Sequence, residues 1–126
     1  MPQTSFYSHK DLDVWKRSVS LVVYLYKVTK RFPPEERFGL VSQIRRASTS
    51  VPANIAEGWG RGSTKEYTQF LKIARGSLTE LDTHLIVSGK LGLVDKDESA
   101  RIETDISDIG KMLNRLIKSL EGKTAG

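Results

Sequence analysis

Basic side chains concentrated in the middle of the chain are the residues with the most evident chemistry. Residues 37–75 carry seven Lys and Arg against two Asp and Glu, whereas residues 76–126 carry seven against nine. Guanidinium and ammonium groups contact phosphate oxygens, and an aromatic ring can stack on a nucleic-acid base. The candidate phosphate contacts are Arg45, Arg46, Arg61, Lys65, Lys72 and Arg75, and the candidate stacking ring is Trp59.

The spacing of these cations predicts how they are presented. Arg45 and Arg46 are adjacent, so on a helix they point about 100° apart and at least one of them must be exposed or lie at a subunit boundary. Lys65, Lys72 and Arg75 follow spacings of seven and three, which predicts that they share one side of the next helix. We therefore expect one positive band that binds phosphates with little sequence preference. The alternative is a solvated helix face without a partner.

A second group of residues, around Pro52, has a structural interpretation. A proline inside a helix removes one hydrogen bond and costs about 3 kcal/mol. We expect Asn54 and Glu57 to hold the bent helix and its end at Gly58 in place, with Glu57 paired to a nearby arginine, so that loss of either side chain costs about 1–3 kcal/mol. Direct contact of these residues with a partner is the other interpretation.

Enzymatic chemistry finds little support. His9 and His84 are far apart in the sequence. The glycines of "GWGRG" follow a helical pattern, whereas a dinucleotide-binding loop follows a strand. The acids at 95, 97 and 98 lie where helix caps belong. A nuclease site would need carboxylates from several helices to converge. We expect a non-enzymatic protein with no metal and no cofactor.

The elements that must position these residues are four helices, recognised by apolar residues at spacings of three and four. We expect them at roughly 9–31, 34–58, 64–89 and 96–121, in a single domain over residues 1–126. Capping patterns support three of the starts, at Ser8 with Asp11, at Ser63 with Glu66, and at Asp95. Short polar connections predict antiparallel neighbours. The predicted fold class is therefore all-α, an antiparallel up-down-up-down four-helix bundle, and the tail "EGKTAG" is expected to fray.

The chain has more apolar residues than the core of one four-helix bundle can bury, and this surplus predicts self-association. The first helix has two apolar stripes, one of them Leu12, Trp15, Val19, Val22 and Tyr26, and further apolar residues flank the predicted core rows at Ile73, Ile86, Met112 and Ile117.

The run Leu21 to Leu25 is too short for a membrane span, and no secretory signal precedes it. The chain has no cysteine. These features fit a cytoplasmic location.

Several segments resemble the four-helix-bundle proteins encoded within intervening sequences of bacterial 23S rRNA genes. They include "SQIRRASTSVPANIAEGWGRGSTKEYTQFLKIARGSLTELDTHL" and "YKVTKRFPPEERFGLVSQ", and the likeness covers about residues 12–120. The residues that carry the resemblance are Gln43, Ile44, Arg45, Arg46, Ala47, Pro52, Asn54, Ile55, Ala56, Glu57, Gly58, Phe70, Leu71, Ala74, Gly76, Ser77 and Glu80.

This resemblance implies a helical bundle that assembles into a ring-shaped homopentamer, and it brings no catalytic residues. The accessory proteins of diversity-generating retroelements are a related class that is basic, binds nucleic acid and associates with a reverse transcriptase. Two functions follow as expectations. One is a module that binds RNA or RNA–DNA intermediates, and the other is an assembly protein that docks a protein partner such as a reverse transcriptase.

Overall fold

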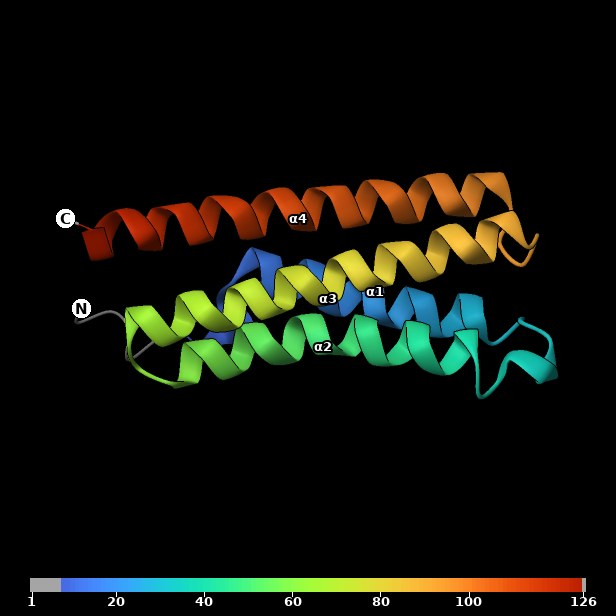
Figure 1. The fold of residues 1–126 in the computed structure, drawn as a ribbon, viewed down its shortest axis with the longest axis horizontal. Helices are drawn as coiled ribbons and strands as arrows, with labels where there is room; N and C mark the ends of the chain where they lie inside the picture. The colour runs from blue at the N-terminus through green and yellow to red at the C-terminus, as the bar shows by residue number, and fades with distance from the viewer. Residues whose placement is uncertain (1–7, 126) are drawn as a thin grey trace.

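The computed structural model describes residues 8–125 as four long helices with short connections (Figure 1). They are α1 (Asp13–Thr29), α2 (Leu40–Gly60), α3 (Thr64–Lys90) and α4 (Lys96–Ala125). Consecutive helices run antiparallel, and α2 and α3 make the most extensive contact. The predicted all-α, up-down-up-down four-helix bundle is thereby confirmed.

The start of the chain departs from the predicted helix at 9–31. A short 3-10 helix, η2 (His9–Asp11), comes first, and Leu12 is extended before α1 begins at Asp13. The predicted cap is present, but it belongs to η2: the Lys10 amide donates to the Ser8 Oγ at 3.1 Å, and the Ser8 amide donates to the Asp11 carboxylate at 3.0 Å. The capping pattern was therefore identified correctly, but it caps a 3-10 helix of one turn and not the long helix predicted from residue 9.

The second predicted helix, 34–58, begins too early. Pro34–Glu36 form a 3-10 turn, η3, and α2 starts at Leu40 and continues to Gly60. The amide of Glu36 donates to the Pro33 carbonyl at 2.9 Å, which closes a turn without starting an α-helix. The chain must first reverse direction between α1 and α2, so the acids next to Pro34 lie in the connection.

The third and fourth helices follow the prediction closely at their starts. The Glu66 amide donates to the Ser63 Oγ at 3.1 Å, and the Glu98 amide donates to the Asp95 carboxylate at 2.8 Å. Gly62 precedes α3 with a φ of 86°, a left-handed conformation that glycine adopts without strain. α4 continues to Ala125, four residues past the predicted end at 121.

The core lies along the bundle axis and is built from aliphatic residues of all four helices. One of the two stripes of α1 enters it, including Leu21, Leu25 and Val28, while Val23 and Tyr26 on the other side stay 51% and 41% exposed. In α4 one prediction is wrong: Ile117, predicted to flank the core, is buried in it, whereas its neighbour Leu116 is only partly buried. No helix within residues 8–125 has the length and apolarity needed to cross a bilayer.

Candidate functional site

Arg45 does not reach solvent as a free cation, because its side chain joins α2 to α1. Its Nε donates to the Thr29 Oγ1 at 3.0 Å, and a terminal nitrogen donates to the Tyr26 carbonyl at 3.3 Å. The guanidinium also lies 4.3 Å from the centre of the Tyr26 ring. These contacts make Arg45 a structural link between two helices.

Arg46 points in a different direction, toward α3. It pairs with the Glu80 carboxylate and donates to the Gln43 side-chain oxygen at 2.8 Å. His84 lies on the other side of the same carboxylate, with its Nε2 at 3.1 Å. The hydrogen bond from His84 and the charge of Arg46 lower the pKa of Glu80. Arg46 is exposed, but part of its charge is compensated by this acid.

Lys72 and Arg75 both extend from α3 to α4. Lys72 Nζ lies 2.7 Å from the Glu121 carboxylate, and Arg75 donates to the Asn114 side-chain oxygen at 3.0 Å. Lys65, in the first turn of α3, is exposed and has no hydrogen-bond or ion-pair partner within the described residues. The structure therefore engages two of the three cations predicted to share a side.

Trp59 and Arg61 lie near the end of α2 and contact the start of α3. Trp59 is half-buried, and its ring meets Tyr67 edge to face with centroids 5.9 Å apart. Arg61 pairs with Glu57 at 3.0 Å and lies 5.0 Å from the centre of the Phe70 ring. Trp59 thus packs on the protein itself, which leaves only part of its surface for a base.

These positions do not form the single positive band expected from the sequence. Arg45 faces α1, Arg46 faces Glu80, and Lys72 and Arg75 face α4. The separation arises because adjacent residues on α2 turn toward different neighbours, and because the shared side of α3 is the side that α4 packs against. Most of these cations have intramolecular partners.

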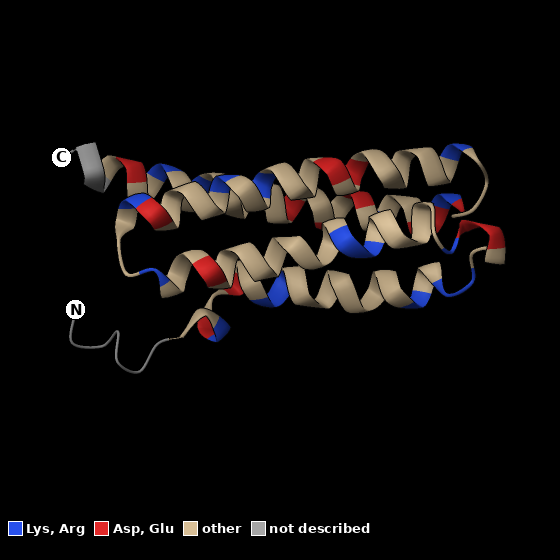
Figure 2. Ribbon diagram, turned by 60° about the horizontal axis from the view of Figure 1, so that its bottom comes forward, with Lys and Arg blue, Asp and Glu red and all other residues tan. Residues whose placement is uncertain are grey.

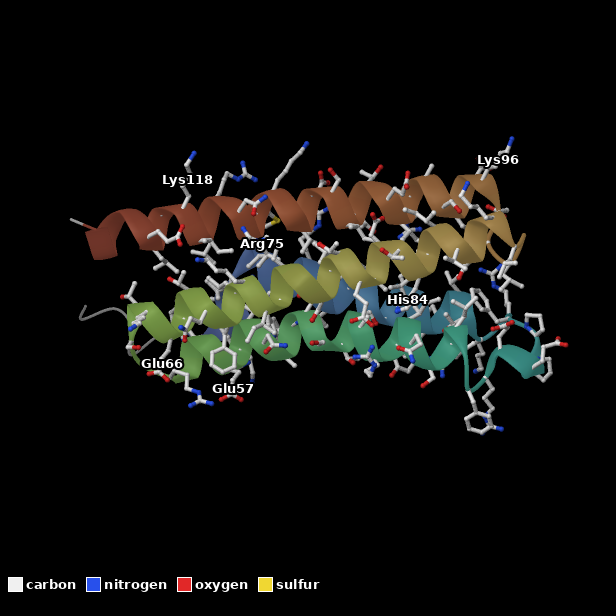
Figure 3. All side chains as sticks on the ribbon, viewed as in Figure 1. Glu57, Glu66, Arg75, His84, Lys96 and Lys118 are labelled. Carbon is white, nitrogen blue, oxygen red and sulfur yellow. The ribbon has the colours of Figure 1, made fainter. Side chains whose placement is uncertain are left out.

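The residues around Pro52 have separate roles in the structure. α2 continues through Pro52, and the Asn54 side chain donates to the carbonyl and hydroxyl oxygens of Ser50 at 2.8 and 2.9 Å, across the turn that contains the proline. Glu57 is exposed and pairs with Arg61 (Figure 3). Because it is exposed, we expect its loss to cost less than the 1–3 kcal/mol of a buried polar group.

Gly58 is buried on the side of α2 that faces α3. A Cβ added to it would lie 2.7 Å from the Phe70 Cβ and 3.2 Å from the Tyr67 carbonyl oxygen. The absence of a side chain at Gly58 therefore sets the distance between the two helices.

Tyr67 is only 9% exposed, and its hydroxyl has no hydrogen-bond partner among the described residues. Burial raises the pKa of Tyr67 to about 12.

A group of cations that the sequence reasoning missed lies on the outer face of α4. Lys111, Arg115 and Lys118, the α4 basic stripe, follow one another at spacings of four and three, so they share a helix face. All three are exposed, and none has an ion-pair partner within residues 8–125. Lys118 points away from the bundle in Figure 3, and blue segments follow one another along this half of α4 in Figure 2.

The charge of residues 76–126 taken together did not indicate the α4 basic stripe, because this segment carries more acids than bases. The acids of α4 lie mostly in its N-terminal half, where Asp105 and Asp108 pair with Arg17 and Glu98 pairs with Arg31. Residues 109–120 contain the three cations and no acid. The net charge of these twelve residues alone is +3, which would have indicated the stripe. Within the described chain, no group of three His, Asp or Glu side chains is arranged to hold a metal ion.

Comparison with known proteins finds a matching family and solved structures that are similar to this chain. The family model described as 23S rRNA-intervening sequence protein matches residues 10–115. A crystal structure of a protein with unknown function from the S23 ribosomal protein family of Bacteroides thetaiotaomicron VPI-5482 is 26% identical, with a TM-score of 0.78 over 83% of this chain and 98% of that chain. No curated protein matches the sequence.

Proposed function

Because this chain belongs to the 23S rRNA-intervening sequence protein family, we propose that it is a non-enzymatic helical-bundle protein that assembles with copies of itself and binds nucleic acid. The α4 basic stripe carries the proposal. Its cations are exposed and unpaired within the described residues, in contrast to most of those predicted from the sequence. Unpaired cations release the counterions of a phosphate backbone without first breaking an internal ion pair.

The geometry of the stripe favours backbone contacts over base reading. At about 1.5 Å of rise per residue, its first and last members are roughly 10.5 Å apart along α4. Lysine and arginine at this spacing can reach successive phosphates of one strand, and such contacts carry little sequence information. The expected ligand is RNA or an RNA–DNA intermediate, by extension from the accessory proteins of diversity-generating retroelements.

The experiment replaces all three residues of the α4 basic stripe with glutamine. Binding of a fluorescein-labelled RNA duplex and of a single strand is measured by anisotropy from 50 to 300 mM salt. Loss of three phosphate contacts should weaken binding to unrelated sequences and reduce the slope of log K against log salt by about 2 to 3. Circular dichroism should show unchanged helicity, because the replaced side chains are exposed.

A matched control removes the same charge from another face. The triple variant K65Q/K72Q/R75Q also lowers the net charge of +5 by three. It should weaken binding less, because Lys72 and Arg75 are already engaged by Glu121 and Asn114. Equal effects of the two variants would mean that only net charge matters. Unchanged binding by the stripe variant at every salt concentration would refute the proposal.

The second candidate is an assembly protein that docks a protein partner, such as a reverse transcriptase, and contacts nucleic acid little. The outward stripe of α1 supports it, because Val23 and Tyr26 are exposed while Trp15, Val19 and Val22 are half-buried. Self-association through such a face is part of both candidates, and five copies is the number that the family resemblance implies. Light scattering that reports a monomer at micromolar concentration would contradict the proposed self-association.

A further inference from the structure

A groove of about 390 Å³ lies between the C-terminal half of α3 and the N-terminal half of α4. Its lining includes the buried side chains of Leu85, Val94 and Ile102, and Ile86 contributes a 42% exposed aliphatic side chain. The groove is on the half of α4 that does not carry the α4 basic stripe. An apolar floor with an exposed isoleucine on its wall is suited to an apolar side chain from outside.

Charged residues line the groove in the same order on both walls. Lys90 on α3 and Lys96 on α4 lie at the end next to the α3–α4 loop, and Lys96 projects from that end in Figure 3. Asp82 and Glu103 lie farther along, roughly 12 Å from Lys90 on α3 and roughly 10.5 Å from Lys96 on α4, at about 1.5 Å of rise per residue. None of the four has an ion-pair partner in the described part of the chain.

We propose that this groove docks an amphipathic helix of a protein partner, with an acidic and a basic residue two turns apart and aliphatic residues between them. The acid would lie over the two lysines and the base over the two acids, because seven residues of helix span about 10.5 Å. The aliphatic residues would contact Ile86 and the floor, as anchors at i+3 and i+4 do in helix-in-groove recognition.

The charge pattern selects this occupant over two others. A small anion would use only the lysine end and leave the apolar floor unoccupied. A nucleic-acid backbone would be repelled by Asp82 and Glu103, which are as numerous as the lysines. A helix that carries both charges satisfies both ends, and a third helix packs readily between two others by ridges and grooves.

The test uses three stapled 15-residue helical peptides with Leu at i+3 and i+4, and with Glu/Lys, Glu/Glu or Lys/Lys at positions i and i+7. Binding to the full chain is measured by fluorescence anisotropy at 150 mM salt. The parent protein should prefer the Glu/Lys peptide by about tenfold, since each replacement turns attraction into repulsion at one end. The variant K90E/K96E, whose groove is wholly acidic, should instead prefer the Lys/Lys peptide.

Two further variants test whether the peptide occupies this groove and not another face of the bundle. Ile86→Asp should abolish binding of the Glu/Lys peptide while leaving helicity intact, because Ile86 is partly exposed. Glutamine at all three positions of the α4 basic stripe should leave peptide binding unchanged, so failure of the nucleic-acid proposal would not affect this one. The proposal is overturned if no peptide binds, if the Glu/Glu peptide binds as well as the Glu/Lys peptide, or if Ile86→Asp binds like the parent.

Discussion

Replacement of Gly58 by alanine should destabilise the bundle, although alanine is the better helix former. The added methyl would lie 2.7 Å from the Phe70 Cβ and 3.1 Å from the Tyr67 Cδ1. A Cβ cannot swing away, so the backbones of α2 and α3 must separate. Overpacking of this kind costs about 1–3 kcal/mol, and the higher helix propensity of alanine returns at most about 1 kcal/mol.

Gly60 provides a matched control two residues along the same helix. A Cβ there would meet nothing within 4 Å. Gly60→Ala should therefore be neutral or slightly stabilising, and the two variants should differ by about 1–3 kcal/mol in the free energy of unfolding. Urea denaturation followed by circular dichroism, at one protein concentration because association adds to apparent stability, measures this difference. If Gly58→Ala is as stable as Gly60→Ala, the reasoning about close helix approach is wrong.

The remaining predictions concern single side chains. Asn54→Ala should lower the free energy of unfolding by about 1 kcal/mol, because the Ser50 carbonyl and hydroxyl lose a donor. Glu57→Ala should lower it by less than about 0.5 kcal/mol, as expected for an exposed ion pair. Equal costs of the two variants in urea denaturation would contradict this assignment. Tyr67 has a pKa raised to about 12, so the unfolded chain loses the phenolic proton first and stability should fall above about pH 10, by up to about 2–3 kcal/mol. Tyr67→Phe should remove that component of the alkaline loss without lowering stability at pH 7, since no hydrogen bond is lost, and an unchanged pH profile would show that Tyr67 is not its source.

Much of the fold could be predicted from the sequence because its signals are local. Apolar residues at spacings of three and four determined the number and order of the helices. Ser63 and Asp95 cap the helices that they were predicted to cap, since a cap depends on residues only three positions away. The prediction was less accurate at α2, whose start depends on how the chain turns back from α1.

Only the tertiary structure decided which neighbour each cation contacts. Arg45 and Lys72 were predicted to bind phosphate, yet one contacts Thr29 and the other Glu121, 49 positions farther along the chain. Such pairs depend on which helices are adjacent and on their register, and neither is encoded in the spacing along one helix. The same holds for Gly58, where a missing side chain matters because of Phe70 on another helix. The sequence by itself therefore determined the family, the four helices and the caps of α3 and α4. Packing decided which charges stay free on the surface, because a side chain's partners lie on other helices.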